Sequence, residues 1–222
     1  MLCSTPMIRI RPHKLFNLVK TDSYSQRVVK LVLPNQNTPV TFDMVIKLAL
    51  AKLIRPRTFF EFGTFLGVQT FNMAMNLPDC EFYTLDLDEE SYKRASIIEA
   101  VRHLSQIQLE QQRQLAFLGT PYETRIHCLR GDSNAFDFGP YHAKMDMIYI
   151  DGGHDERTCR SDTENAFRML SRGRPSVIVW DDYCNPLSPA VKEYLDGRRE
   201  DLFFVEESLT VFHLSGVSVD LG

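Results

Sequence analysis

The chain has 222 residues and a formal net charge of −4, from 25 Lys and Arg against 29 Asp and Glu. Hydrophobic residues make up 44% and aromatic residues 11%, enough to fill the core of one domain, which excludes a disordered chain or a disulfide-dependent miniprotein. A mildly acidic balance without a basic stripe is unlike a nucleic-acid-binding surface, so we expect no nucleic-acid partner.

Cysteine usage and hydropathy indicate where the protein works. The five cysteines are scattered and include no Cys-x-x-Cys pair, so we expect reduced thiols and neither a disulfide framework nor a zinc site. No apolar run approaches the roughly 18 residues that span a bilayer, and the N-terminus lacks the apolar stretch of a signal peptide. We therefore expect a cytoplasmic protein without a membrane partner, as a monomer or a homo-oligomer.

The predicted elements begin with an arm and then alternate between strands and helices. Residues 1–40 contain four prolines and are predicted to form an irregular arm ahead of one domain at residues 41–222. Short apolar runs predict seven strands, at residues 58–62, 82–86, 125–129, 147–151, 176–180, 202–205 and 210–214. Segments of helical period predict helices at residues 42–54, 68–76, 90–117, 157–171 and 189–195.

This alternation predicts an α/β fold. Strands that are apolar almost throughout favour a doubly wound, mostly parallel sheet with helices on both faces. Only residues 206–209 separate the last two strands, too few for a crossover helix, so these strands are predicted to form an antiparallel hairpin. The prediction is a Rossmann-like seven-stranded sheet that ends in a C-terminal hairpin.

The first predicted strand runs into a glycine turn that extends from Glu61 to Gly67, with the sequence EFGTFLG. Gly63 lets the backbone pass close to a ligand, and Gly67 opens a helix whose first N–H groups point outward. Phe65 stands where a dinucleotide-binding motif has its middle glycine, which disfavours a pyrophosphate ligand. The alternative interpretation is a turn that requires glycine for its geometry alone.

Acidic residues follow the next two strands. Asp86 lies at the tip of the second strand, where a carboxylate can accept hydrogen bonds from both hydroxyls of a ribose, and Asp88 is the second candidate. After the third strand, Asp132 can accept a hydrogen bond from an exocyclic amine such as that of adenine, or it can cap the turn that follows. A nucleoside-containing cofactor would use both acids.

Three more acids end the fourth and fifth predicted strands, namely Asp151, Asp181 and Asp182. If these strands are neighbours, about 4.8 Å apart, the three carboxylates converge and repel one another unless a cation compensates. Mg²⁺ or another divalent cation takes oxygen ligands and leaves positions for a substrate. The alternative is that Asp151 alone contacts the cofactor while Asp181 and Asp182 cap the turn before the last helix.

His154, three residues after Asp151, is the candidate general base, since histidine titrates close to neutral pH. We expect it to act with Asp151 as the catalytic pair. A histidine in a turn is also a common structural hydrogen-bond donor, so this second interpretation stays open.

Five motifs occur in one order along the chain: Glu61 to Gly67, Asp86, Gly131-Asp132-Ser133, Ile150-Asp-Gly-Gly-His154 and Trp180-Asp-Asp-Tyr183. With the predicted hairpin, they resemble the class I S-adenosylmethionine-dependent methyltransferases over about residues 40–216. Within that superfamily they are similar to the small-molecule O-methyltransferases of macrocin type and, more distantly, of catechol type.

The resemblance implies an enzyme that methylates a small-molecule hydroxyl, on a sugar, an aromatic ring or a natural product, with S-adenosylmethionine as cofactor. The implied cofactor contacts are Glu61 and Gly63 at the methionine end, Asp86 at the ribose, Asp132 and Ser133 at the adenine, and Thr64, Gly67 and Asp151. The alternative function is that of a nonenzymatic protein of the same fold that binds S-adenosylmethionine or S-adenosylhomocysteine.

The resemblance also implies that Asp151, Asp181 and Asp182 bind a divalent metal such as Mg²⁺. One position departs from the macrocin-type pattern, which tends to read Asp-x-Asp where this chain has Gly153. Either His154 then takes the proton of the acceptor, or deprotonation is left to the metal and water.

Overall fold

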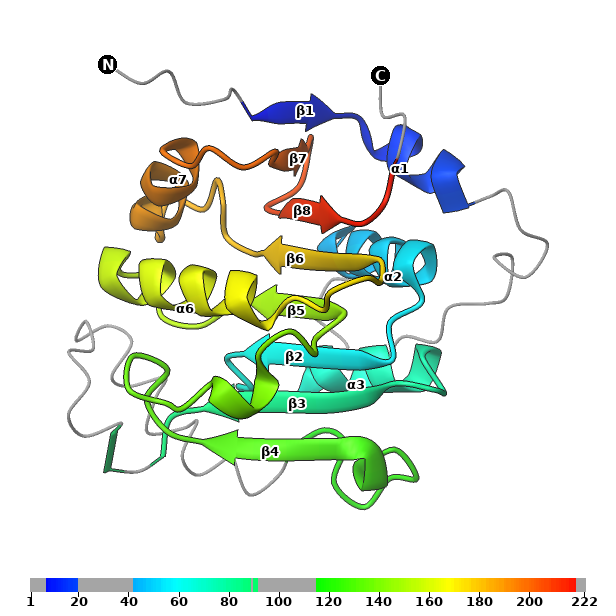
Figure 1. The fold of residues 1–222 in the computed structure, drawn as a ribbon, viewed down its shortest axis with the longest axis vertical. Coiled ribbons are helices and arrows are strands. Elements are labelled where there is room, and N and C mark those ends of the chain that lie inside the picture. The colour runs from blue at the N-terminus through cyan, green and yellow to red at the C-terminus, as the bar shows by residue number, and fades with distance from the viewer. Residues whose placement is uncertain (1–6, 20–41, 89, 92–114, 219–222) are drawn as a thin grey trace.

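The computed structural model describes residues 7–19, 42–88, 90–91 and 115–218. Their strands form one sheet in the order β1-β7-β8-β6-β5-β2-β3-β4 (Figure 1). The strands are β1 (Ile8–Ile10), β2 (Thr58–Phe62), β3 (Glu81–Asp86), β4 (Ile126–Arg130), β5 (Met147–Ile150), β6 (Ser176–Trp180), β7 (Phe203–Val205) and β8 (Val211–Ser215).

The seven predicted strands are all present, and each boundary lies within one residue of the prediction. β2 to β6 run parallel to one another, whereas β8 is antiparallel to both of its neighbours, β6 and β7. This confirms the α/β fold and the C-terminal hairpin. The five residues between β7 and β8 are too few for a crossover helix, so the chain must reverse direction there.

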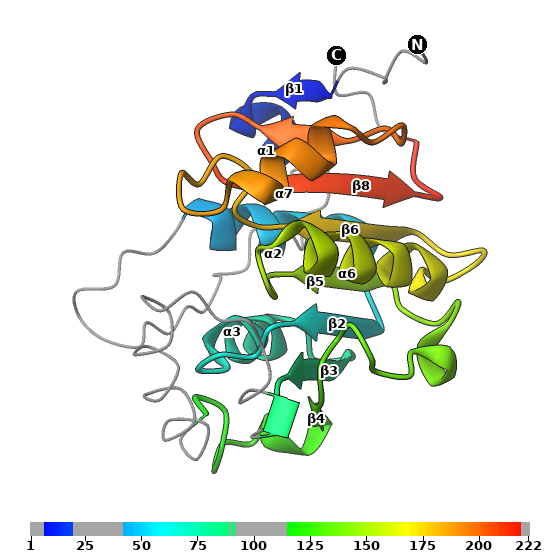
Figure 2. The same ribbon diagram turned by 90° about the vertical axis from the view of Figure 1, so that its left-hand side faces the viewer.

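Helices cover both faces of the sheet, with α2 and α3 on one face and α6 and α7 on the other (Figures 1 and 2). Their bounds are α1 (Pro12–Val19), α2 (Phe42–Ile54), α3 (Val68–Asn76), α6 (Glu156–Met169) and α7 (Pro189–Asp196), with short 3-10 turns at η3 (Glu123–Arg125) and η4 (Gly139–Tyr141). Of the helix predicted at 90–117, residues 92–114 lie outside the described residues, and residues 116–119 form a turn.

Strand periodicity divides the core between these two faces. Phe59 and Tyr149 pack with α2 and α3, while the adjacent Phe60 and Ile150 pack with α6 and α7. Successive side chains of a strand point to opposite faces, so a strand that is apolar throughout can supply both halves of the core. The sheet is therefore buried on both sides, and ligand contacts fall to the loops at the strand ends.

The N-terminal prediction was wrong for part of the arm, because residues 8–10 form β1 and residues 12–19 form α1. β1 pairs in parallel with β7, with Ile8 opposite Phe203, and its Ile10 is buried. Leu15 of α1 is fully buried against the core. A three-residue strand has no recognisable period, and its partner is distant in sequence, so only the tertiary structure identifies it.

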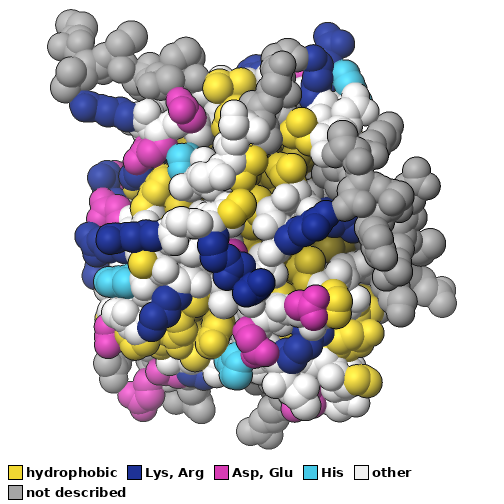
Figure 3. Space-filling view, turned by 45° about the vertical axis from the view of Figure 1, so that its right-hand side comes forward, with side chains coloured by type: hydrophobic (Ala, Val, Ile, Leu, Met, Phe, Trp, Pro, Cys, Tyr) yellow, Lys and Arg dark blue, Asp and Glu magenta, His cyan; other side chains and the backbone are white. Residues whose placement is uncertain are grey.

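The surface carries no strong charge asymmetry on the face shown in Figure 3, where Lys and Arg side chains lie dispersed among acidic and hydrophobic ones. None of the helices in the described ranges has both the length and the apolar character needed to cross a membrane. The cysteines within those ranges, Cys80, Cys128, Cys159 and Cys184, are free thiols.

Candidate active site

The candidate site lies where the five parallel strands β2 to β6 end, at the edge marked by their arrowheads in Figure 1. β2 has β3 on one side and β5 on the other, so the strand order reverses at β2. Ligands of open α/β sheets bind outside the carboxyl ends of the strands at such a reversal. The predicted site residues lie at the ends of these strands or just after them, and the fold brings them to one edge.

The glycine turn after β2 requires both of its glycines. Gly63 has φ +92°, and a Cβ there would lie 2.1 Å from the carbonyl oxygen of Asp151. Gly67 has φ +69°, and a Cβ there would lie 2.5 Å from Cε1 of Phe117. Only a residue without a side chain fits either position. The turn therefore packs directly against the backbone that follows β5.

Asp86 ties the end of β3 to this turn. Its Oδ2 accepts a 3.0 Å hydrogen bond from the N–H of Phe65, and its Oδ1 accepts one of 2.9 Å from the N–H of Leu87. Burial raises the pKa of Asp86, and these two N–H donors partly offset the rise. The side chain remains partly exposed, so its further lone pairs are available to ligand hydroxyls.

Glu61 lies beneath the turn and is fully buried. Its Oε2 accepts 2.5 Å hydrogen bonds from the hydroxyls of Thr70 and Thr84, and Thr84 is 2.7 Å from the hydroxyl of Thr64. Burial raises the pKa of Glu61 to about 7, against the lowering effect of both threonine donors. Its Oε1 is buried without a hydrogen-bond partner among the described residues, which leaves one acceptor unused below the turn.

Asp132 after β4 caps its own turn. Its Oδ1 accepts hydrogen bonds from the backbone N–H and the side-chain amide of Asn134, at 2.9 and 3.1 Å. The same amide donates to the hydroxyl of Thr158 in α6, which links this turn to that helix. Below it, burial raises the pKa of Asp162 to about 7, partly offset by the hydroxyl of Ser133. The carboxylate of Asp132 therefore makes the contacts of a turn cap, as the second interpretation of this residue predicted.

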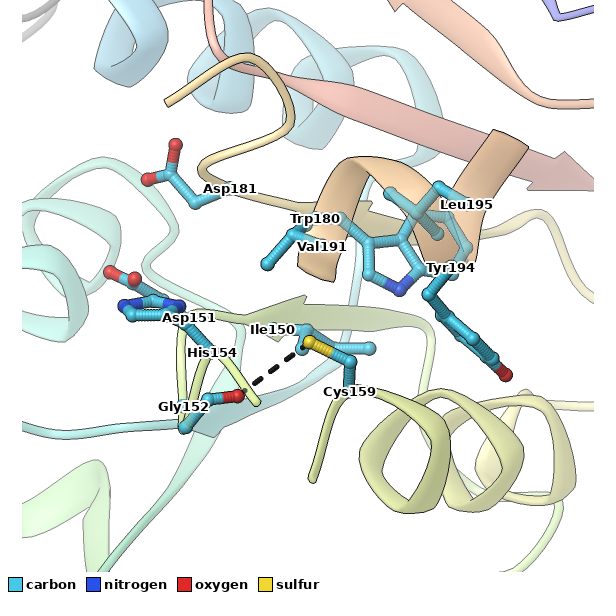
Figure 4. A pocket seen from close by; sticks show the side chains of 11 residues that line it. Ile150, Asp151, Gly152, His154, Cys159, Trp180, Asp181, Val191, Tyr194 and Leu195 are labelled. Atoms are coloured by element: carbon cyan, nitrogen blue, oxygen red, sulfur yellow. Dashed lines mark hydrogen bonds between the residues drawn. The ribbon is translucent and has the colours of Figure 1, made fainter. Parts of the chain in front are cut away.

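Asp151, His154 and Asp182 form a cluster whose nearest carboxylate and imidazole atoms all lie within 4.8 Å of one another. His154 Nε2 is 3.2 Å from Asp182 Oδ2, and Figure 4 shows the His154 ring beside Asp151. Asp182 has φ +62°, an uncommon conformation for a residue other than glycine. Two carboxylates and one imidazole at this spacing suit a single divalent cation.

Asp181 is engaged elsewhere and points away from His154 and Asp151 in Figure 4. Its Oδ2 accepts a 2.8 Å hydrogen bond from Lys47 Nζ and a very short one from the hydroxyl of Tyr149. The structure thus groups Asp151 and Asp182 with His154, where the sequence predicted a group of three carboxylates.

Lys47 is a site residue that the sequence pattern did not predict. It lies in α2 among apolar neighbours, is 3% exposed, and donates a 2.6 Å hydrogen bond to the Tyr149 hydroxyl. One signal could have indicated it. Side chains two residues apart on a strand point to the same face of the sheet. Asp181 therefore lies on the same face as Val179, which packs with α2. A lysine within that helix is a partner for the acid.

Their surroundings shift the pKa values of Asp151 and Asp181 in opposite directions. Burial raises the pKa of Asp151 well above its usual range, and repulsion from Asp181 and Asp182 adds to this, although Lys47 and the Tyr149 hydroxyl oppose it. Burial by itself would raise the pKa of Asp181, but Lys47 and Tyr149 lower it below the usual range. Lys47 and Tyr149 therefore favour the ionised form of Asp181, whereas burial and like charges disfavour that of Asp151 unless a further cation lies nearby.

Neighbouring side chains explain why the two residues after Asp151 are glycines. A Cβ on Gly152 would lie 2.9 Å from Asp162 Oδ2, and one on Gly153 would lie 2.9 Å from Cγ2 of Thr158. Thr158 is fixed by Asp155, which caps α6 by accepting from the Thr158 N–H at 3.1 Å and from its hydroxyl at 2.7 Å. The cap of α6 thus leaves no room for an acid at position 153.

A cavity of about 10 Å³, the size of roughly one water molecule, adjoins the cluster. Asp151, His154 and Asp181 line one side of it (Figure 4). The other side is largely apolar and comes from the strand ends, α6 and α7, through Ile150, Cys159, Trp180, Val191, Tyr194 and Leu195. A ligand group placed beside the cluster would meet an apolar wall.

Known proteins with the same fold include several methyltransferases. A candidate caffeoyl-CoA O-methyltransferase from Staphylococcus aureus superposes with a TM-score of 0.52 at 14% identity, covering 80% of this chain and 84% of that one. A candidate O-methyltransferase from Klebsiella pneumoniae gives 0.51 at 18% identity, covering 93% and 90%. A methyltransferase from Podospora anserina, solved with S-adenosylhomocysteine bound, gives 0.51 at 12% identity, covering 95% and 91%.

The sequence itself matches the family described as "Methyltransferase domain" over residues 60–183. That stretch is more than half of the chain and holds the glycine turn, Asp86, Asp132 and the cluster of Asp151, His154 and Asp182. The chain therefore belongs to the methyltransferase domain family, which confirms its resemblance to the class I S-adenosylmethionine-dependent methyltransferases.

Proposed function

We propose that the protein transfers a methyl group from S-adenosylmethionine to a hydroxyl of a small molecule, with a divalent cation in the cluster of Asp151, His154 and Asp182. The observation that carries this proposal is the contact of Gly63 with the carbonyl oxygen of Asp151, which leaves no room for a Cβ. The glycine turn, on the proposed cofactor side, and the cluster, on the proposed acceptor side, therefore meet at Asp151.

The residues around the turn fit the proposed cofactor. Asp86 offers free lone pairs to the ribose hydroxyls, and the buried Oε1 of Glu61 is an unused acceptor beneath the turn, suited to the ammonium of the methionine end. Gly63 and Gly67 allow the backbone to approach the ligand. We propose further contacts from Thr64, Asp132, Ser133 and Asp151, as the family resemblance implies.

The cofactor supplies an electrophilic methyl group, and a bound cation would make an acceptor hydroxyl more acidic. The residues of the chain would hold the acceptor in line with that methyl group, because displacement depends on distance and angle. Asp151 and Asp182 would compensate the charge of the cation, and the apolar wall formed with α7 would exclude water from the acceptor.

The ligand set bears on which cation would bind. Mg²⁺ prefers six oxygen ligands, whereas imidazole suits first-row metal ions such as Fe²⁺, Ni²⁺ and Zn²⁺, with Mn²⁺ the weakest binder of that row. With His154 in the cluster and Asp181 bonded to Lys47, we propose a transition-metal ion in preference to Mg²⁺.

His154 has a second proposed role. Its Nε2 lies 3.2 Å from Asp182 Oδ2, and a carboxylate so placed can orient an imidazole as a general base. In a cycle without a metal, His154 would accept the proton of the acceptor hydroxyl. Metal ligand and general base are alternative roles of the same imidazole, so one experiment can separate them.

The test has two stages. Calorimetry of the full chain with S-adenosylmethionine and S-adenosylhomocysteine should show binding of both, and lack of binding to either would contradict the proposal. Mass spectrometry should then detect methylation across a panel of catechols, sugars and hydroxylated natural products, with Mn²⁺, Mg²⁺ or a chelator present. Binding of both nucleosides without turnover of any acceptor would favour the nonenzymatic alternative.

A further inference from the structure

A buried lysine stands among the acids at the ends of β5 and β6. Lys47 reaches them from α2, and its side chain is 4% exposed. An ammonium group is costly to bury without a partner. Here Nζ donates to Asp181 Oδ2 at 2.8 Å and to the Tyr149 hydroxyl at 2.6 Å, so two of its three N–H groups are satisfied by the site.

These bonds occupy Asp181. Its Oδ2 accepts from Lys47 and Tyr149, and its Oδ1 accepts a 3.0 Å hydrogen bond from the N–H of Asp182. The carboxylate is thereby fixed on the α2 side of the strand ends, outside the cluster of Asp151, His154 and Asp182.

The charged groups can be counted as two sets, which meet at the Tyr149 hydroxyl because it bonds Asp181 and also lies 3.0 Å from Asp151 Oδ2. Lys47 and Asp181 form a neutral pair, and the cluster is left with the carboxylates of Asp151 and Asp182. Two negative charges match one divalent cation, whereas three would leave an excess negative charge on the occupied site.

We infer that Lys47 is an internal cation that withholds Asp181 from the cluster and so limits the carboxylates offered to a divalent ion to two. Lys47 is a positioning residue, because it acts through Asp181 and Tyr149. The inference rests on the proposed metal site but not on methyl transfer, since it concerns the affinity for the ion alone.

Removal of the charge should therefore strengthen metal binding. In Lys47→Met, whose side chain has similar length without the ammonium, Asp181 loses its partner and is free to turn toward the cluster. We expect the dissociation constant for Mn²⁺, measured by calorimetry on chelator-treated full chain, to fall by about tenfold or more, because a nearby carboxylate is added. We also expect Mn²⁺ to raise the thermal midpoint of this variant more than that of the unsubstituted protein.

Three controls separate this effect from general damage. Lys47→Arg keeps the charge and should keep the original Mn²⁺ affinity. Lys52→Met removes the same charge from the last turn of the same helix and should also leave it unchanged. The double variant Lys47→Met with Asp181→Asn should lose the gain, because the added affinity is assigned to the Asp181 carboxylate.

An equal or weaker Mn²⁺ affinity in Lys47→Met would overturn the inference. If that variant does not fold, the double variant Lys47→Met with Asp181→Asn decides, because it removes both charges of the pair. An Mn²⁺ affinity equal to that of the unsubstituted protein is expected, and a tenfold loss would show that Asp181 is a ligand after all. Tighter binding in Lys47→Met when the unsubstituted protein binds no Mn²⁺ would support the inference yet contradict the metal in the proposed function. Absence of Mn²⁺ binding from both proteins would overturn both.

Discussion

The N–H of Phe65 donates a 3.0 Å hydrogen bond to Asp86 Oδ2, joining the glycine turn after β2 to the end of β3. The bond crosses between two parallel strands that are neighbours in the sheet. It holds the carboxylate beside the turn while leaving it partly exposed. Asp86 can therefore serve the turn and a ligand at the same time.

Replacement of Asp86 should weaken cofactor binding. Asp86→Ala removes the acceptor proposed for the ribose hydroxyls, and loss of about 1.4 kcal/mol or more corresponds to at least a tenfold higher dissociation constant for S-adenosylhomocysteine. Calorimetry measures this directly. Asp88→Ala is the matched control, because Asp88 Oδ1 accepts from the N–H of Ser91 and is not among the proposed cofactor contacts. Equal losses in the two variants would refute the assignment.

Substitution of Gly63 should destabilise the fold beyond the strain of its backbone. Gly63→Ala would place Cβ 2.1 Å from the Asp151 carbonyl oxygen at φ +92°, so the turn and the end of β5 would have to separate. We expect a loss of about 3 kcal/mol or more in the free energy of unfolding, measured in urea.

Gly173 supplies the control for that experiment. It also has positive φ, at +80°, but a Cβ there meets no atom within 4 Å. Gly173→Ala should therefore lower the free energy of unfolding by only about 1–2 kcal/mol, the cost of a side chain at positive φ. If both alanine variants lose the same stability, the close approach of Gly63 to Asp151 contributes nothing.

Stability should fall as pH rises through the range in which Glu61 loses its proton. Burial raises the pKa of Glu61 to about 7 in the folded protein, so between its unfolded value and about pH 7 the folded state binds more protons than the unfolded state. The free energy of unfolding then decreases with rising pH, by roughly 3 kcal/mol for a shift of this size.

Glu61→Gln should remove that contribution and so reduce the difference between urea unfolding at about pH 5 and at about pH 8. Asp162→Asn should act in the same direction, because burial also raises the pKa of Asp162 to about 7. An unchanged pH dependence in Glu61→Gln would mean that Glu61 is already ionised in the folded state at low pH.

Replacement of His154 distinguishes a metal ligand from a general base. As a ligand, His154→Ala should weaken Mn²⁺ binding by about tenfold and Mg²⁺ binding much less, because Mg²⁺ depends on oxygen ligands more strictly than first-row metal ions do. His127→Ala is the control, since His127 pairs with Glu81 at 3.0 Å on β4, away from the cluster. Slower methyl transfer with unaltered Mn²⁺ affinity would instead assign the role of base.

Local sequence patterns were sufficient to predict the order of most strands and helices and the direction of the last strand. Strands such as Thr58–Phe62 and Ser176–Trp180 were predicted with their observed bounds, because short apolar runs next to turn residues have few other ways to bury their side chains. The hairpin was predicted from the length of its connection alone. The placement of acids after strands also followed, since parallel strands end at one edge.

Tertiary contacts decided the grouping at that edge. The sequence placed Asp181 and Asp182 side by side, but the fold turns the first toward Lys47 and the second toward His154. Lys47 lies 134 residues before Asp181, and a contact between residues so far apart in the sequence cannot be predicted from local periodicity. The edge strand β1 was missed for the same reason, because its partner β7 is formed by residues near the other end of the chain.

The sequence by itself therefore determined the order of the elements, the glycine turn and the acids that follow each strand, because these depend on side-chain period and backbone freedom. Only the tertiary structure decided which acids lie beside His154 and which one is paired with a buried lysine. Those outcomes depend on burial and on charges brought together from distant parts of the chain, which change the energy of a carboxylate without changing its place in the sequence.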